Sequence, residues 1–290
     1  MLDAMTSDPG LDLSALRALR ARRAGVADPQ RVSGLLERIE SHLDEHAGYL
    51  AFSGGKDSLI VLDLVRQVDP AVPVVWFNSG LNFPEVPDYI AHLADQWQLN
   101  LTTIAAQPTA LQIILDSGIW NHDAPQGATL DLGEALIDEP AREAHHREGP
   151  GELWGVRAAE SRARKMMYAR AVTREIAHSC QGCCPGGERT RAHYAAHGGL
   201  VRRQDGTVAY GPIWDWSTEQ VWDYIAARDL PVNPVYERLR SLGAPPEALR
   251  VSTLLSDTGL QHGRITWLRR GWPDLFEELA AQLPRLREFV

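Results

Sequence analysis

The sequence has little cysteine, almost no lysine and no long apolar run, and each shortage excludes a class of protein. Its three cysteines, Cys180, Cys183 and Cys184, lie within five residues, which excludes a disulfide framework and favours a reduced metal or redox site. No apolar stretch approaches the ~20 residues that a membrane span requires. Met1 to Met5 lack a basic segment followed by an apolar core, so we expect no secretory signal, no membrane association and a cytoplasmic location.

Positive charge is also in short supply. The 290 residues include 29 Lys+Arg against 38 Asp+Glu, a formal net charge of −9. This balance argues against a surface coated in positive charge for non-specific nucleic-acid binding, so DNA stays open as a partner only through a local basic groove. A hydrophobic content of 44% is ordinary for a globular protein of this length, which can bury a substantial core.

Lysine occurs only at Lys56 and Lys165, and all other cationic side chains of the Lys+Arg count are arginine. Lys56 lies in Ser53-Gly54-Gly55-Lys56-Asp57-Ser58, between the apolar run 49–52 and the helical pattern 59–65. Glycines allow backbone N–H groups to approach an anion closely, and a helix N-terminus adds its positive end. A lysine ammonium and a serine hydroxyl in the same turn can bind phosphate groups, which are anions of this kind. The pattern predicts a nucleotide site, and its alternative is a plain strand–helix connector.

The order of the patterns predicts a doubly wound parallel α/β sheet, Rossmann-like, with helical extensions at both ends. We expect strands at 72–77, 101–104, 152–156 and 208–213, and helices at 84–98, 159–178 and 216–227, the last with Ser217 as N-cap. Residues 118–150 look irregular, with the composition of a mobile loop over the site. Residues 179–207 look loop-like.

Three segments follow from these patterns. Residues 1–46 form a helical extension with one leucine stripe on each side of Pro29. Residues 47–235 form the nucleotide-binding domain, with a cysteine-containing insert at 179–207. Residues 236–290 form a helical segment in which tryptophans lie beside arginines. Such tryptophans either stack bases or pack helices, and packing is the more common case.

The motifs, in order, resemble the phosphoadenosine phosphosulfate reductase family of the N-type ATP pyrophosphatases, with the adenine nucleotide α-hydrolase-like fold. This family includes the small subunit of ATP sulfurylase and a DNA-phosphorothioation protein. The resemblance covers about residues 48–240. It rests on Ser53–Ser58, on Phe77-Asn78-Ser79-Gly80, on Gly155-Val156-Arg157 with Glu160-Ser161-Arg162, on Pro212–Trp216, and on Pro231-Val232-Asn233-Pro234-Val235-Tyr236.

The resemblance implies a role for each matching position. Ser53, Gly54, Gly55, Lys56, Asp57 and Ser58 would hold the β- and γ-phosphates of ATP. Asn78, Ser79 and Gly80 would lie near the adenosine. Arg157 and Arg162 would reach the α-phosphate or an oxyanion substrate, unless they line a solvated helix face with Arg164. Mg²⁺ would assist, with Asp57 as a candidate ligand.

The chain departs from the reductase branch near its C-terminus. Those enzymes carry a nucleophilic cysteine in a Glu-Cys-Gly-Leu-His-type motif, whereas this chain has Asp257-Thr258-Gly259-Leu260-Gln261-His262. No cysteine follows Cys184, so a thiosulfonate intermediate cannot form there.

The cysteine cluster has four interpretations. Cys180-x-x-Cys183 followed by His193-x-x-x-His197 approximates a Cys₂His₂ zinc spacing. Three thiolates, Cys184 included, would also suit an iron–sulfur cluster. In the third interpretation, one thiolate carries a persulfide in a sulfur relay. In the fourth, the three cysteines are simply reduced thiols without a chemical role.

Three functions therefore stay open. The first is an ATP pyrophosphatase-type nucleotidyltransferase that activates an acceptor oxygen, in sulfur metabolism and with a sulfur-donor protein as partner. The second is a sulfonucleotide reductase-like enzyme. The third is a nucleotide-sensing subunit of a DNA-modification complex. The sequence does not identify the acceptor.

Overall fold

A computed structural model describes residues 29–123, 130, 132–179, 194, 197–251 and 264–290. Within these ranges, a single six-stranded sheet organises the chain. Its strands are β1 Gly48–Ala51, β2 Pro73–Asn78, β3 Asn100–Ala105, β4 Gly151–Leu153, β5 Leu200–Arg202 and β6 Val208–Tyr210. Their order across the sheet is β3-β2-β1-β4-β6-β5, and every pair is parallel except β5 with β6. The doubly wound α/β fold is confirmed.

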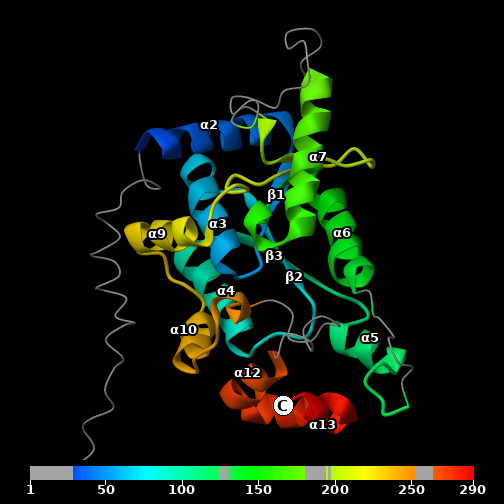
Figure 1. Cartoon of the computed structure of the whole chain (residues 1–290). Coiled ribbons are helices and arrows are strands. Elements are labelled where there is room, and N and C mark those ends of the chain that lie inside the picture. The colour runs from blue at the N-terminus through cyan, green and yellow to red at the C-terminus, as the bar shows by residue number, and fades with distance from the viewer. Residues whose placement is uncertain (1–28, 124–129, 131, 180–193, 195–196, 252–263) are drawn as a thin grey trace, which may run out of the picture.

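Helices cover both faces of this sheet (Figure 1). The α-helices are α2 Pro29–Glu45, α3 Lys56–Val68, α4 Glu85–Trp97, α5 Ala110–Ser117, α6 Glu139–Glu148, α7 Arg162–Ser179, α9 Thr218–Arg228, α10 Pro234–Ser241, α12 Arg264–Gly271 and α13 Pro273–Gln282. One π-helical turn, η1 Glu134–Asp138, and three 3₁₀ turns, η2 Ala158–Glu160, η3 Pro246–Ala248 and η4 Pro284–Phe289, complete the described set. None of the described helices has both the length and the apolar character that a bilayer span requires.

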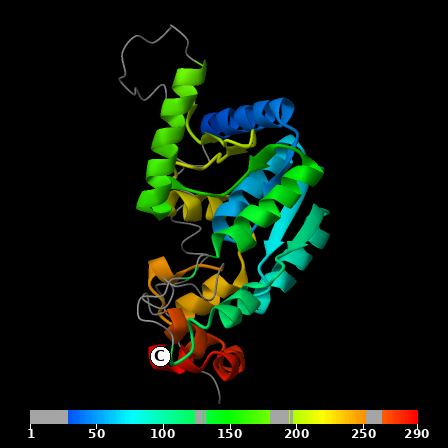
Figure 2. The same cartoon turned by 90° about the vertical axis from the view of Figure 1, so that its right-hand side faces the viewer.

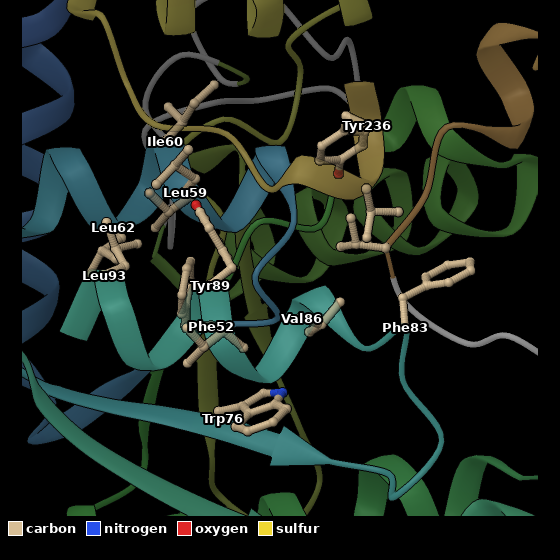
Figure 3. Close-up of a cluster of buried hydrophobic side chains, with 14 of the residues drawn as sticks. Phe52, Leu59, Ile60, Leu62, Trp76, Phe83, Val86, Tyr89, Leu93 and Tyr236 are labelled. Atoms are coloured by element: carbon tan, nitrogen blue, oxygen red, sulfur yellow. The ribbon is translucent and has the colours of Figure 1, made fainter. Parts of the chain in front are cut away.

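The alternation of side chains along β1 explains the two layers. Leu50 points to the large core shared with α3 and α4, and Tyr49 points to the opposite face, where Ala144 of α6 packs. Figure 3 shows the first of these layers, in which Phe52 and Leu59 meet side chains from β2 and α4. The apolar core therefore lies directly beneath the strand end that carries the glycine turn.

The C-terminal helices join the same core. Trp272 packs on Phe83 with ring centroids 4.1 Å apart, and its Nε1–H donates to both oxygens of Glu85 at 2.8 Å. Trp216 and Trp272 are buried, so these two tryptophans pack helices and are not free to stack bases. The C-terminal segment contains the helices α12 and α13, and Leu268 of the first and Leu279 of the second are both buried in the same core.

Two sequence expectations are wrong. The region 118–150 contains η1 and α6, and α6 contacts β1, β2 and β3 as a structural helix. It was missed because Pro140 and Ala144 are its only buried residues, too few for a recognisable stripe. The region 179–207 contains β5, an edge strand of three residues. The first leucine stripe lies outside the described residues, whereas the second packs through α2 with Ile39 fully buried.

Smaller differences concern boundaries. The helix expected from residue 159 begins at Arg162, and the preceding turn η2 is 3₁₀. The expected cap at Ser217 is confirmed, because its hydroxyl accepts from the Gln220 N–H while the Gln220 side chain accepts from the Ser217 N–H.

Candidate functional site

The candidate site lies at the carboxyl ends of β1 and β4. From β1 the chain moves through β2 to β3 on one side, and it then returns to β4 on the other side of β1. The order of the strands therefore reverses between β1 and β4. Open α/β sheets bind ligands at such a point, beyond the carboxyl ends of the strands. The turn Ser53–Ser58 follows β1 there, and the segment from Trp154 to Arg157 follows β4.

Glycine backbone conformations and the Ser58 hydroxyl determine the shape of the turn after β1. Gly54 has φ +72°, a conformation that favours glycine, and Gly55 is an extended N-cap without a side-chain cap bond. The Ser58 hydroxyl donates to the Gly55 carbonyl at 3.1 Å and accepts from the Ser53 N–H at 3.3 Å. Ser58 is buried, so its hydroxyl shapes the turn, and its direct contact with phosphate stays a prediction.

Two backbone N–H groups of this turn are candidate donors to a ligand. Among the described residues, no acceptor is hydrogen-bonded to the N–H groups of Gly54 and Asp57. Asp57 lies in the first turn of α3, where the helix dipole is positive. An anion is the ligand that such donors attract, because it accepts hydrogen bonds and complements the dipole. The geometry of the turn therefore suits a phosphate group.

A charged triad lies beside these donors. Lys56 Nζ is 2.6 Å from Asp57 Oδ2, and Arg157 Nε is 2.6 Å from Asp57 Oδ1. The Arg157 side chain is 2% exposed, and its Nη1–H donates to the Trp216 carbonyl at 2.8 Å. Two cations around one carboxylate leave one net positive charge at the helix start. Arg157 is thus no part of a solvated helix face.

This triad decides what Asp57 can do. Each of its carboxylate oxygens pairs with one cation, so Asp57 orients Lys56 and neutralises part of the buried Arg157. Each oxygen keeps a further lone pair, and the role of Asp57 as a Mg²⁺ ligand stays a prediction. A direct contact between Arg157 and a phosphate stays a prediction.

Gly155 brings the β4 segment to the start of α3. A Cβ at this position would lie 2.5 Å from the Ser58 nitrogen and 2.7 Å from the Asp57 carbonyl carbon. Only a residue without a side chain permits this approach, which carries Arg157 to Asp57. The Arg157 N–H then donates to Glu160 Oε2 at 3.0 Å, and Glu160 also pairs with Arg164.

The end of β2 adds a third segment. Asn78 Oδ1 accepts from the Gly80 N–H at 2.9 Å and from Asn82 Nδ2 at 2.8 Å. Gly80 has φ +74°, and a Cβ there would lie 2.8 Å from Thr109. Because β2 pairs with β1 in parallel, Asn78, Ser79 and Gly80 lie at the same sheet edge as the phosphate turn. Their contact with an adenosine stays a prediction.

Two residues that sequence reasoning left out of the site close it from α10. The Lys56 N–H donates to the Tyr236 hydroxyl at 2.9 Å, and Asn233 Nδ2 donates to the Gly54 carbonyl at 3.4 Å. Both residues are buried. Burial raises the pKa of Tyr236, so its hydroxyl stays protonated. The available signal was Asn233-Pro234, a helix start, because Asn233 caps α10 through the Val235 N–H. Figure 3 shows Tyr236 at the edge of the buried cluster.

The remaining expected site residues are not brought into this cluster. Arg162 is exposed at the first position of α7, and His197 is partly buried. Cys180, Cys183, Cys184 and His193 lie outside the described residues, as does the string from Asp257 to His262. No group of three or more potential metal ligands occurs among the residues that the structure describes. The zinc and iron–sulfur interpretations therefore stay predictions.

Comparison with known proteins gives one extended match to a family. Residues 48–248 match the model of the phosphoadenosine phosphosulfate reductase domain. Two similar relatives are phosphoadenosine 5'-phosphosulfate reductases. That of Xanthomonas euvesicatoria pv. vesicatoria (strain 85-10) is 26% identical over 239 residues, and that of Xylella fastidiosa (strain 9a5c) is 26% identical over 241 residues. Each alignment covers 81% of this chain and 84% of the relative.

Among solved structures, two similar ones are the phosphoadenylyl-sulfate reductase of Candida auris in its phosphate complex and the NMN synthetase of Francisella tularensis. The first has a TM-score of 0.45 at 17% identity, covering 71% of this chain and 84% of that one. The second has a TM-score of 0.44 at 14% identity, covering 84% of this chain and 94% of that one. Similarities this distant carry no argument about chemistry.

Proposed function

The chain belongs to the phosphoadenosine phosphosulfate reductase domain family, and from this we propose that it is an enzyme that binds an adenine nucleotide by its phosphates at Ser53–Ser58. The observation that carries the proposal is that the N–H groups of Gly54 and Asp57, next to the Lys56–Asp57–Arg157 triad, have no acceptor in the part of the chain that the structure describes. Backbone donors, the positive end of a helix dipole and one surplus positive charge belong to the same short turn.

The reaction that we propose is adenylyl transfer from ATP. An oxygen of the acceptor attacks the α-phosphorus, the bond to the β-phosphate oxygen breaks, and pyrophosphate leaves. Negative charge grows on the departing pyrophosphate, where the Gly54 and Asp57 N–H groups and the Lys56 ammonium would stabilise it. Mg²⁺ would arrive bound to the phosphates of the nucleotide, with Asp57 as a candidate protein ligand beside Lys56 and Arg157.

The two arginines take different roles in this proposal. Arg157 is a positioning residue, because its guanidinium holds Asp57 and the Trp216 carbonyl. Arg162 begins α7, is exposed and has no partner among the described residues. It is our candidate for contact with the α-phosphate or with an oxyanion acceptor.

A second candidate is a sulfonucleotide reductase, which the names of the relatives favour. The sequence opposes it, because no cysteine follows Cys184 and Thr258 stands where the resemblance places the nucleophile. A threonine hydroxyl cannot form the thiosulfonate intermediate. We therefore rank adenylyl transfer first.

The chain supplies its own control for the test. We expect Lys56→Ala to lose ATP binding or to release pyrophosphate at least ~100-fold more slowly, the order that removal of one preorganised donor costs. Lys165→Ala, which removes the only other lysine, exposed on α7, should leave the rate unchanged. Candidate acceptors are sulfate, a nucleobase, a DNA phosphate and a small metabolite.

The possible outcomes separate the candidates. Pyrophosphate release from ATP supports adenylyl transfer, and sulfite release from phosphoadenosine phosphosulfate with a dithiol reductant supports the reductase. Tight ATP binding without either product supports a nucleotide sensor. Release at the wild-type rate from Lys56→Ala would exclude this site altogether.

A further inference from the structure

The motif Pro212–Trp216, which follows β6, is bonded to the backbone and side chain of the Arg157 segment. The Arg157 Nη1–H donates to the Trp216 carbonyl at 2.8 Å, and the Ala158 N–H donates to the Trp214 carbonyl at 2.7 Å. Two successive residues of the arginine segment therefore depend on two carbonyls of one motif. The position of Arg157 is set by whatever fixes this motif in place.

Two tryptophan side chains fix the motif. Trp216 is 1% exposed and packs on Tyr224 of α9, with ring centroids 5.5 Å apart. Trp214 contacts two tyrosines, Tyr168 of α7 with ring centroids 5.3 Å apart and Tyr194 at 6.0 Å with an interplanar angle of 19°. Figure 2 shows α7 in green alongside the yellow segment that contains β5, and these two elements are in contact. The motif is thus held from α9 on one side and from α7 on the other.

Glycines leave the space that the rings of Trp214 and Tyr168 fill. A Cβ at Gly198 would lie 2.4 Å from Trp214 Cζ2, and a Cβ at Gly211 would lie 2.6 Å from the Tyr168 hydroxyl oxygen. Such distances are far below an ordinary contact between nonbonded atoms. The two rings therefore pack closely against neighbouring backbone and have one well-defined position.

Tyr168 also reaches the arginine segment directly. Its side chain is fully buried, and its hydroxyl donates to the Val156 carbonyl at 2.7 Å. Burial raises the pKa of Tyr168, so the hydroxyl stays protonated and remains a donor. Val156 and Ala158 are the two neighbours of Arg157 in the chain. The backbone on each side of the arginine is therefore bonded to one member of the Trp214–Tyr168 pair.

We infer that Trp214 and Tyr168 are positioning residues of the nucleotide site. They hold Arg157, whose Nε lies 2.6 Å from Asp57 Oδ1. The other oxygen of Asp57 lies 2.6 Å from Lys56 Nζ, so the same support fixes the ammonium group. The inference rests on the proposed function, because the Lys56 ammonium is the group that would stabilise the departing pyrophosphate.

This arrangement predicts an effect on the rate and little effect on ATP affinity. The N–H groups of Gly54 and Asp57 belong to the phosphate turn and to α3, which the aromatic pair does not hold, so they stay available to bound ATP. The orientation of Lys56 does depend on the pair. A displaced cation costs more in the transition state, where charge has grown on the leaving group, than in the ground state.

Single substitutions test this division between rate and affinity. Tyr168→Phe keeps the ring and removes only the hydroxyl that bonds to Val156, so kcat for pyrophosphate release should fall at least ~10-fold while the dissociation constant of ATP changes less than ~3-fold. Trp214→Ala should lower kcat at least as much, and Trp214→Phe, which keeps a ring beside Tyr168, should recover most of the rate. Tyr224→Phe is the matched control. It removes another buried hydroxyl bond, to Asp63 at 2.7 Å, and should lower stability without lowering kcat.

A second measurement does not depend on turnover. The chain has only the lysines Lys56 and Lys165, so NMR of protein with isotope-labelled lysine gives two sets of side-chain signals, which Lys165→Ala assigns. We expect the Lys56 signals to shift in Tyr168→Phe and to stay in place in Tyr224→Phe. Such a shift supports the inference even if the wild type releases no pyrophosphate, an outcome that would refute adenylyl transfer alone.

Two results would overturn the positioning role. One is a Lys56 signal that stays in place in both Tyr168→Phe and Trp214→Ala. The other is a fall in kcat that is the same in Tyr168→Phe and Tyr224→Phe, because an effect common to both variants reports only a loss of stability.

Discussion

The substitution Gly155→Ala tests how closely the β4 segment must approach the phosphate turn. The added methyl carbon would lie 2.5 Å from the Ser58 nitrogen, 2.7 Å from the Asp57 carbonyl carbon and 2.9 Å from the Ser58 Cα. All three are backbone atoms, so no side chain can rotate away. Restoring an ordinary contact of 3.4 Å requires a movement of about 0.9 Å between Gly155 and the start of α3.

That movement acts directly on the charged triad. Arg157 lies two residues after Gly155, and its Nε is 2.6 Å from Asp57 Oδ1. A displacement of about 0.9 Å lengthens this contact beyond hydrogen-bonding distance, so Lys56 and Asp57 lose their fixed orientation. A misplacement of about 1 Å in a catalytic arrangement costs on the order of 100-fold in rate. We therefore expect a loss of about that size in pyrophosphate release.

The assay needs a folding control and a matched glycine. Gly34 lies inside α2, and a Cβ there would have no heavy atom within 4 Å. Gly34→Ala should leave the rate unchanged and stabilise the fold by roughly 0.5–1 kcal/mol. Circular dichroism and urea denaturation establish that Gly155→Ala is folded at the assay temperature. A folded Gly155→Ala protein with wild-type ATP affinity and rate would refute this account of the site.

Two further predictions concern stability. Tyr236→Phe removes the acceptor of the partly buried Lys56 N–H, so urea denaturation should show a free energy of unfolding lower by about 1–2 kcal/mol; an unchanged value would contradict the bond. Burial, and then the nearby charge of His46, lowers the pKa of His42 from 6.5 to about 4, so the unfolded chain binds more protons between these values. Stability is therefore lost as the pH falls, by about 2 kcal/mol from about pH 7 to about pH 5 through this one group. His42→Leu should remove that share of the pH dependence in parallel denaturation curves, and identical slopes would exclude it.

Local patterns were sufficient for most of the sheet. The apolar run before Ser53 and the glycines after it predicted β1, the turn and α3, because a short buried strand and a glycine turn each leave a signal in adjacent residues. The cap at Ser217 was predictable for the same reason. α6 was not predictable, because a helix that buries little besides Pro140 and Ala144 leaves no periodic stripe. β5 is three residues long and pairs only at the edge of the sheet.

The candidate site likewise has one part that local sequence patterns predict and one part that they do not. The residues of the phosphate turn are contiguous, so their chemistry is visible in the sequence. The sequence does not show which of Arg157 and Arg162 is buried at the site, since both are arginines in one short motif. Only the fold makes Arg157 the buried partner of Asp57, 100 residues away, and leaves Arg162 exposed.

Tyr236 shows why a site residue that is distant in the sequence could not be predicted. It lies 180 residues from Lys56, and no spacing rule connects the two. The connection arises because the strand order reverses at β1, which leaves the carboxyl end of β1 uncovered by its own crossover helix. A later segment must cover this end, and α10 does so through Asn233 and Tyr236. The first backbone donor of α3 is therefore satisfied by the protein itself, whereas the N–H groups of Gly54 and Asp57, which have no acceptor among the described residues, are candidate donors to a ligand. A phosphate that bound through the Lys56 N–H instead would have to displace the Tyr236 hydroxyl, so Tyr236→Phe separates the two arrangements by its effect on ATP affinity.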